Sequence, residues 1–367
     1  MASKIFLREF SIELAPRLAH GFCYSSGGLL PVAVFLPTSY FAMQIVFGRH
    51  MYQSGTGLQL REFCDVPIGT EGYPLRLAYT GYPDLDFRLC ALVALFQTLL
   101  DPAAYRPLVV ELMTTLAVIT MIPFVEAARE KRSILLRMPG VVGILFQLFS
   151  FAFIMPLYYI ALILTGAAIS RPVKGSGTKI NQGNAEALLF ALIIGYIIPT
   201  IYMIVSQGVI STALWQGYPI IMALAQFAHL IIRPSSRHAQ SGHTTIQAMY
   251  GFIFAASAGL HIYYTWPLFF DIQQFQKILV PHLALSKRPL SLLEGVAAVL
   301  QWDTVFATGS TFLVTFWFAQ SVKDILLLFL WHVVISIAFG PGAAIAGVLL
   351  VREARLNARA VEDNKEQ

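Results

Sequence analysis

Charged residues are scarce in this sequence of 367 residues. Asp, Glu, Lys and Arg make up 12% of the chain and hydrophobic residues 57%, whereas an ordinary soluble domain carries about 25% charged residues. The 25 Lys and Arg residues are spread over the segments between apolar runs, so no surface for nucleic acid is expected. This composition excludes a soluble domain and predicts an all-α integral membrane protein.

Cysteine and the common cofactor motifs are also scarce or missing. Cys23, Cys64 and Cys90 show no CxxC spacing, which predicts neither a disulfide framework nor a zinc site. The sequence lacks a GxGxxG turn, a P-loop, an HExxH motif and a DDxxD-type acidic cluster, the kind of cluster that holds magnesium against a diphosphate. We therefore expect no cofactor, no metal and no metal-dependent ionisation of a prenyl diphosphate.

Long apolar runs fill the sequence instead. A bilayer core of about 30 Å requires about 20 apolar residues per helix, and eight runs come close to that length: 27–47, 107–125, 139–165, 186–206, 213–232, 247–267, 304–319 and 325–351. A ninth run, 85–100, is shorter and fits a tilted crossing or a re-entrant segment. The predicted fold is a bundle of about eight transmembrane helices, or nine if 85–100 also crosses. It comprises an N-terminal segment 1–26, a transmembrane helical domain 27–351 and a polar C-terminal tail 352–367.

Two local patterns bear on topology. The densest basic cluster is Arg129–Arg137, and Lys and Arg are enriched in cytoplasmic loops, so this loop is expected to face the cytoplasm. In FGPGAAIAG, Pro341 lacks a backbone donor and is flanked by glycines, which predicts a break or bend in the last run. We favour a packing kink, because Ala343 and Gly347 have the spacing of closely packed helices. The other reading is a broken transporter helix that coordinates an ion.

Ionisable residues within apolar runs are costly and are therefore candidates for function. Glu111 is either a rim residue that reaches toward the interface or a functional acid. For the histidines we favour packing over catalysis in each case: His229, His261 and His332. Near 85–100, Asp84 and Arg88 stand at i and i+4 and are expected to pair along one helical face, which leaves Asp86 free. Alternatively, both aspartates cap a helix that begins near Pro83.

Aromatic residues are plentiful, with 27 Phe, 15 Tyr and 5 Trp. Many of them are expected to face lipid or form interfacial belts. The remainder would suit a pocket for a cationic, apolar intermediate, because aromatic faces attract cations.

Three stretches together carry a resemblance to a known family: PLRLAYTGYPDLDFRLCALV, LQWDTVFATGSTFLV and FGPGAAIAGVLLVRE, in this order between Pro74 and Glu353. They resemble the membrane-bound terpene cyclases of fungal secondary metabolism, specifically the ascochlorin/ascofuranone type and its relatives in indole-diterpene clusters. The chain departs from that pattern in Asp84 and Arg88, where apolar residues are expected, and in GVLLV, where aromatics are expected.

The resemblance implies a multi-helix, multi-pass cyclase of the endoplasmic reticulum membrane that works without a cofactor. Its substrate would be an oxidised, often epoxidised prenyl chain on an aromatic or indole head, as in meroterpenoids and indole diterpenoids. Its partners would be this lipophilic substrate, the lipid bilayer and the epoxidase and prenyltransferase of the same pathway. The resemblance places acids at Asp86 and Asp303, and we expect Trp302 and Tyr79 to line the substrate pocket.

The expected function is therefore cyclisation initiated by protonation of an epoxide. The donor must carry a proton at neutral pH, and burial raises the pKa of a carboxyl group. We favour Asp303 as the acid because its neighbours in sequence are apolar, followed by Asp86 and then Glu111. Two other classes remain open: an exporter of the same metabolites and a non-catalytic membrane scaffold of the pathway.

Overall fold

The computed structural model describes residues 28–100, 103–168, 178–282 and 290–365. The predicted N-terminal segment 1–26, with Cys23, lies outside the described residues. Within these ranges the chain is helical and forms no strand, apart from an isolated bridge between Asn181 and Ser241. The predicted all-α class is confirmed.

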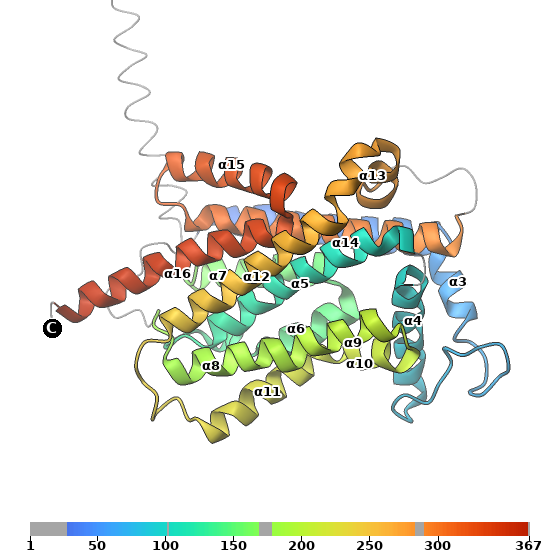
Figure 1. The fold of residues 1–367 in the computed structure, drawn as a ribbon, viewed down its shortest axis with the longest axis horizontal. Helices are drawn as coiled ribbons and strands as arrows, with labels where there is room; N and C mark the ends of the chain where they lie inside the picture. Colours follow the sequence, from blue (N-terminus) through green and yellow to red (C-terminus); the bar gives the residue numbers. More distant parts are fainter. Residues whose placement is uncertain (1–27, 101–102, 169–177, 283–289, 366–367) are drawn as a thin grey trace, which may run out of the picture.

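The helices follow one another with short connections (Figure 1). In chain order they are α2 Leu30–Ala42, η1 Met43–Gln53, α3 Thr56–Glu62, α4 Pro83–Leu100, η2 Ala103–Tyr105, α5 Arg106–Ala127, η3 Ile134–Leu136, α6 Pro139–Phe149, α7 Phe151–Leu164, α8 Gln182–Ala191, η4 Leu192–Ile197, α9 Ile198–Ser206, α10 Val209–Gln216, α11 Tyr218–Ile232, α12 His243–Tyr264, η5 Trp266–Phe270, α13 Ile272–Leu279, α14 Leu292–Thr315, η6 Phe316–Phe318, α15 Val322–Phe339 and α16 Pro341–Lys365.

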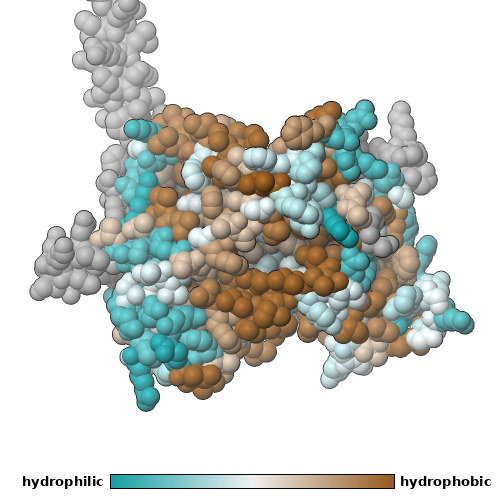
Figure 2. Space-filling model, in the orientation of Figure 1, coloured by the Kyte–Doolittle hydropathy of each residue, from teal (hydrophilic) through white to brown (hydrophobic). Residues whose placement is uncertain are grey.

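Polar and apolar side chains separate along the long helices. Figure 2 shows hydrophilic side chains gathered toward two opposite ends of the molecule, with hydrophobic side chains between them. Helices α5, α12, α14 and α16 run between these two ends (Figure 1). Among the described residues, five helical segments are long and apolar enough to cross a membrane: Leu30–Gln53, Ala103–Ala127, Gln182–Ser206, His243–Phe270 and Val322–Phe339. The predicted count of eight or nine crossings is not confirmed.

Several predicted runs are broken or turned in the structure. Run 139–165 divides into α6 and α7 at Ser150, where φ is +76°. Run 325–351 divides into α15 and α16 at Gly340, which confirms the break predicted at Pro341. Helix α4, which contains run 85–100, lies across the direction of α5 and α14 (Figure 1) and is not among the five candidate spans.

Helix α5 forms the centre of the bundle, and α16 packs against α5, α12 and α15. Apolar residues gain little by leaving lipid for protein, so close contact between backbones holds such helices together. A Cβ atom at Gly347 would lie 2.4 Å from the Trp331 ring, and one at Gly195 would lie 2.5 Å from Met222. The close packing expected around Gly347 is therefore present.

A buried ionic cluster joins α5 to α16. Glu126 accepts from Arg129 at 3.0 Å, Arg132 at 2.9 Å and Arg352 at 2.6 Å, and Arg129 also pairs with Glu353. These side chains are almost wholly removed from solvent. The boundary expected between residues 351 and 352 therefore falls inside α16, and part of the basic loop turns inward rather than facing water.

Cys64 and Cys90 form a disulfide with a Cα–Cα distance of 5.8 Å, so the expectation of no disulfide is wrong. Spacing gave no sign of it, because the partners are 26 residues apart and meet only when the loop after α3 folds back onto α4. Two cysteines can bridge only when folding brings their Cα atoms within about 7 Å.

Candidate functional site

Asp86 organises the loop that precedes α4. Its carboxylate accepts hydrogen bonds from the Thr80 N–H at 2.6 Å, the Thr80 hydroxyl at 2.7 Å and the Gly81 N–H at 3.2 Å. Burial acts to raise the pKa of the Asp86 carboxyl, but these hydrogen bonds and the charge of Arg76 together hold that pKa below its usual value. Asp86 thus acts as an anchored carboxylate. Tyr79, in the same loop, donates its hydroxyl to the Leu75 carbonyl at 2.5 Å.

The pair predicted between Asp84 and Arg88 does not form. Both side chains are exposed, and no ion pair within 4 Å joins them in the described part of α4. An exposed pair gains little attraction in water and loses side-chain entropy, so spacing alone does not ensure contact.

Asp303 is buried where α14 meets the start of α7. Its Oδ1 accepts the Ala152 N–H at 2.9 Å, just after Ser150, where α6 ends and α7 begins. The first N–H groups of a helix lack intrahelical partners, and a carboxylate there satisfies one of them. Asp303 thus caps α7 from a different helix. The neighbouring Trp302 is also engaged, because its Nε1–H donates to the His282 carbonyl at 3.1 Å.

Glu111 has different surroundings, within the first two turns of α5. Its Oε1 accepts from the Thr265 hydroxyl at 2.6 Å and contacts His261 Nδ1. Its Oε2 is buried and has no hydrogen-bond partner among the described residues. The two oxygens of this carboxyl group therefore differ, because Oε1 is hydrogen-bonded and Oε2 is not.

The contact of the second ring nitrogen of His261, Nε2, indicates how many protons the Glu111–His261 pair carries. His261 Nε2 lies 3.1 Å from the Ile337 carbonyl oxygen, and a carbonyl can only accept, so Nε2 carries hydrogen. The contact between His261 Nδ1 and Glu111 Oε1 then contains a further proton, which belongs either to the carboxyl or to the imidazole. Glu111 and His261 form a buried pair through which a proton can be transferred.

At the break between α15 and α16, the backbone of Gly340 lies close to the Glu111–His261 pair. Gly340 has φ of +89°, and a Cβ there would lie 3.0 Å from His261 Nδ1 and 3.2 Å from Glu111 Oε2. Glycine permits both the left-handed conformation and the close approach. The break predicted from Pro341 therefore contributes to the packing around an acid, in line with the reading that we favoured.

The Glu111–His261 pair lines a cavity of about 390 Å³ with a mostly apolar wall. Its lining residues are Leu108, Glu111, His261, Thr265, Phe269, Phe275, Leu279, Gln301, Thr304, Val305, Thr308, Gly309, Phe312, Ser336, Ile337 and Pro341. An adjoining cavity of about 620 Å³ shares several of these walls: Val305, Gly309, Phe312, Ser336 and Ile337. The two spaces together match the size range of small-molecule sites and suit an elongated apolar ligand.

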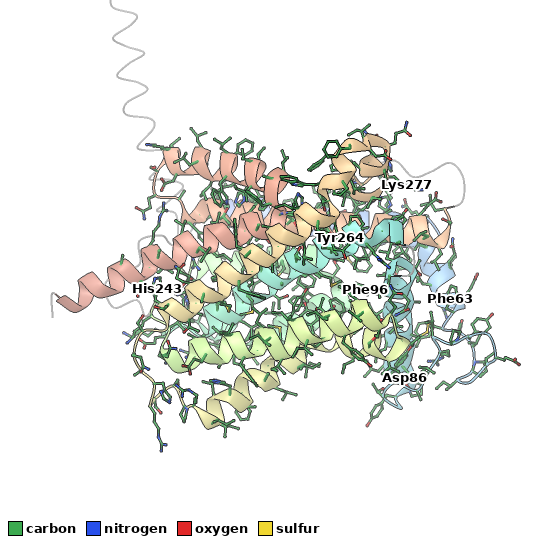
Figure 3. All side chains as sticks on the ribbon, viewed as in Figure 1. Phe63, Asp86, Phe96, His243, Tyr264 and Lys277 are labelled. Atoms are coloured by element: carbon green, nitrogen blue, oxygen red, sulfur yellow. A yellow bond between two sulfur atoms is a disulfide. The ribbon has the colours of Figure 1, made fainter. Side chains whose placement is uncertain are left out.

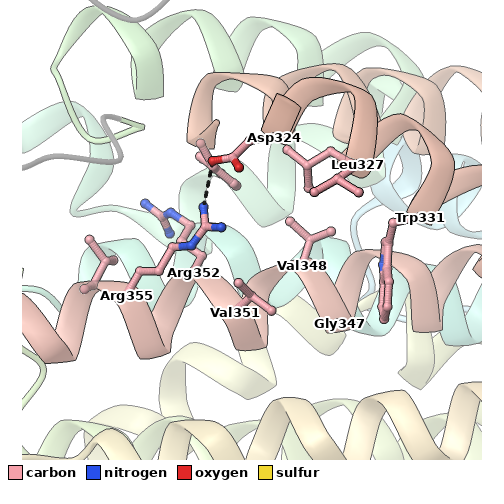
Figure 4. Close-up of a pocket in the computed structure, with 11 residues that line it drawn as sticks. Asp324, Leu327, Trp331, Gly347, Val348, Val351, Arg352 and Arg355 are labelled. Atoms are coloured by element: carbon pink, nitrogen blue, oxygen red, sulfur yellow. Dashed lines mark ion pairs between the residues drawn. The ribbon is translucent and has the colours of Figure 1, made fainter. Parts of the chain in front are cut away.

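A third pocket, between α15 and α16, is shown in Figure 4 and has a volume of about 170 Å³. Leu327, Trp331 and Val348 line it together with Asp324 and Arg355. Its one carboxyl group pairs with Arg355 at 3.6 Å, so this pocket offers no acid comparable to Glu111.

The profile of the CtvD-domain family matches residues 32–356, which include the whole of this arrangement. The chain belongs to the CtvD-domain family. A curated relative, terpene cyclase ascI of Acremonium egyptiacum, is 26% identical over 196 residues, or 48% of this chain and 50% of that protein. The chain thus matches about half the length of this relative, and no solved structure matches the chain. The resemblance to fungal terpene cyclases of the ascochlorin type is confirmed.

In this CtvD-domain protein the three predicted acids do not share one site. Figure 3 places Asp86 at the N-terminal end of α4, far from Tyr264. Tyr264 directly precedes Thr265, which belongs to the Glu111 site. Asp303 contacts α7, whereas Glu111 contacts α12 and lines a cavity. Within the described ranges, no group of three His, Cys, Asp or Glu residues could hold a metal ion.

Two residues of this candidate site, His261 and Thr265, cannot be assigned to it from the sequence. A lone histidine in an apolar run is more often a packing residue than a catalytic one, and a threonine in an apolar run is ordinary. Their spacing of four residues places both on one face of a helix. That spacing was the available signal, but nothing in the sequence connects this face to Glu111, 150 residues earlier.

Proposed function

We propose that this protein is a membrane terpene cyclase that closes rings in an epoxidised prenyl chain after protonating the epoxide. The observation that carries the proposal is the buried Glu111–His261 pair at an apolar cavity, with Glu111 Oε2 unpartnered among the described residues. Family membership and the named relative support the class of reaction. The epoxidised meroterpenoid or indole-diterpenoid substrate follows from the resemblance and is part of the proposal.

In the proposed donor state, Oε2 carries a proton, and His261 carries hydrogen on both nitrogens. Transfer of the Oε2 proton to the epoxide oxygen breaks one C–O bond, leaves a hydroxyl group on the substrate and places positive charge on carbon. The electron pair of a nearby double bond then forms the new ring bond. The carboxylate that remains is stabilised by hydrogen bonds from Thr265 and His261, because charge-assisted hydrogen bonds favour the ionised form.

The cavity wall suits the cation that forms. Phe269, Phe275 and Phe312 line the space beside Glu111, and aromatic faces attract positive charge most strongly where water is excluded. The apolar wall also limits capture of the cation by water before the ring closes. These residues supply the surroundings that the aromatic-rich sequence led us to expect.

The exporter hypothesis rested on the broken last helix. The contact of Gly340 with Glu111 and His261 accounts for that break by packing at the acid, so no further observation favours transport. Asp303 and Asp86 remain candidate acids. Both oxygens of Asp86 and Oδ1 of Asp303 already accept hydrogen bonds from backbone or hydroxyl donors. Glu111 lines the cavity and has an oxygen without a partner among the described residues, which makes it the better supported donor.

The test uses membranes from cells that express the full chain, sealed as vesicles and given a prenylated phenol with a terminal epoxide. We expect cyclic products of the same mass as the substrate, identified by chromatography and mass spectrometry. Accumulation of unchanged epoxide inside the vesicles would instead support an exporter. Neither conversion nor accumulation, with the protein present at normal level, would favour a scaffold and contradict the proposal.

A further inference from the structure

The larger cavity contains a histidine that the steps above do not use. His332 of α15 lines the 620 Å³ space together with Phe306, Phe312, Phe316 and Phe329. Its side chain is buried and lies parallel to the Phe312 ring, with 4.0 Å between ring centroids and 20° between planes. Among the described residues, His332 thus provides the one imidazole in a wall that is otherwise formed by aromatic and aliphatic residues and the hydroxyl residues Thr38, Ser310 and Ser336.

The hydrogen bonds of Thr315 define which nitrogen of His332 carries hydrogen. The Thr315 hydroxyl donates its single hydrogen to the Phe312 carbonyl at 2.6 Å. The same oxygen lies 2.8 Å from His332 Nε2, and both bonds can be made together only if Nε2–H donates to the hydroxyl oxygen. His332 Nδ1 then carries a lone pair.

That lone pair is unused. His332 Nδ1 is buried and has no hydrogen-bond partner in the part of the chain that the structure describes. A buried polar atom without a partner costs free energy, and such atoms call for an explanation such as a catalytic role. Apart from Glu111 Oε2, which is the proposed donor, the unpartnered groups of the described residues that line the two cavities are the hydroxyls of Thr308 and Ser336. A hydroxyl is a far weaker base than an imidazole.

We propose that His332 Nδ1 accepts the proton whose loss ends the cyclisation; this inference rests on the proposed function. The C–H bond next to the cationic carbon breaks, its electron pair forms a C=C bond, and the proton passes to Nδ1. One proton enters from Glu111 and one leaves to His332, so the product is an isomer of the substrate. The imidazolium that results keeps its Nε2–H bond to Thr315, and the parallel Phe312 ring stabilises its charge.

The arrangement separates the start of the reaction from its end. Glu111 lines the smaller cavity and His332 the larger one, and Ser336, one turn after His332 on α15, lines both. The epoxide end of the substrate would lie in the smaller cavity, and the carbon that loses the proton would lie in the larger one. This placement restricts the position of the new double bond, because the base contacts one end of the ligand.

The test compares the parent with His332→Gln, using His229→Gln as the matched control, because His229 of α11 lines neither cavity. Gln can still donate to Thr315 but carries no basic nitrogen at the Nδ1 position. We expect His332→Gln to consume epoxide at nearly the parent rate while its share of the parent olefin falls about tenfold or more. Water-capture products, heavier by one water molecule, or other double-bond isomers should replace it. His229→Gln should retain the parent product.

A second variant provides the test if the His332→Gln protein is absent from membranes. Thr315→Val removes the hydroxyl that orients the ring and should change the products in the same direction but less. The proposal is overturned if His332→Gln, or Thr315→Val where the former is absent from membranes, gives the parent product mixture. It is also overturned if a well-expressed His332→Gln protein consumes no epoxide, because the base would then act before ring closure. A parent that converts no epoxide would contradict the proposed function itself.

Discussion

Asp86, Asp303 and Glu111 are all buried, with exposed fractions of 1%, 9% and 6%, but their contacts differ. Asp86 accepts three hydrogen bonds from two neighbouring residues, and Asp303 accepts one from a helix N-terminus. Glu111 contacts a histidine and a threonine and keeps one oxygen free of partners among the described residues. The same chemical group thus serves as a loop anchor, a helix cap and a candidate acid, according to its donors.

We expect Asp86→Asn to lower the free energy of unfolding in a pH-dependent way. The pKa of the folded-state carboxyl lies below the reference value of 3.8, so the carboxylate stabilises the fold fully above pH 3.8. This contribution is lost as pH falls through the lowered folded-state pKa. Unfolding of detergent-solubilised protein should show the same parent–variant difference at pH 5 and pH 8, and a smaller one in stronger acid.

Asp84→Asn is the matched control for that experiment. Asp84 is exposed and forms no ion pair with Arg88 within the described chain, and such surface changes are usually within about 0.5 kcal/mol. A larger effect for Asp84→Asn than for Asp86→Asn would mean that the two aspartates have been assigned the wrong roles.

At the scale of helices, the sequence predicted apolar runs better than it predicted helix ends. Hydropathy predicted the apolar runs, and Pro341 predicted the break between α15 and α16. The break at Ser150, which has a positive φ, has no local sequence signal, and the N–H of the nearby Ala152 bonds to Asp303, 151 residues later in the chain. Composition predicts a polar tail from Arg352 onward, because it cannot show that Arg352 pairs with Glu126 and Glu353 with Arg129 inside the bundle.

The buried ionic cluster makes Arg129 a strong determinant of stability. Arg129→Ala would leave Glu126 and Glu353 buried with fewer cations, and removing one partner of a buried pair typically costs about 3–5 kcal/mol. Arg137→Ala, an exposed residue at the end of the same loop, should change stability by less than about 0.5 kcal/mol. Thermal unfolding of both purified variants tests this, and equal stability of the two would contradict a structural role for the cluster.

At the scale of the whole molecule, the disulfide and the basic loop lead us to predict one orientation in the membrane. The Cys64–Cys90 disulfide lies before helix α5, and the Arg129 loop follows it, with the candidate span Ala103–Ala127 between them. Disulfides persist in oxidising compartments, whereas Lys and Arg are enriched in cytoplasmic loops. The disulfide end should therefore face the lumen and the Arg129 end the cytoplasm.

Cysteine labelling checks this orientation. In a Cys23→Ser background that keeps the disulfide, an added Ser133→Cys should react with an impermeant maleimide in sealed, cytoplasmic-side-out vesicles. Glu71→Cys, in the loop between Cys64 and Cys90, should react only after the membrane is permeabilised. The reverse pattern would contradict the topology, and labelling of both sites in sealed vesicles would mean that Ala103–Ala127 does not cross.

Much of the overall architecture could be predicted from sequence, and the candidate site only in part. Composition and run length identified an all-α membrane protein, and three motif blocks identified the family. Glu111 was recognised as a candidate because a carboxyl group in an apolar run is costly. Its partners His261 and Thr265 lie 150 and 154 residues away, and such pairings depend on how the helices pack, which one sequence does not specify.

The central claim is that the Glu111–His261 pair supplies the proton that starts cyclisation. The most direct test is the initial rate of cyclic product formation by membranes with equal amounts of parent, Glu111→Gln and Asp303→Asn protein. Gln cannot donate the acid proton, so Glu111→Gln should slow the reaction by about 10²–10⁴-fold. Asn can still accept the Ala152 N–H, so Asp303→Asn should stay within about threefold of the parent. A nearly full rate for Glu111→Gln together with a large loss for Asp303→Asn would contradict the account and identify Asp303 as the donor.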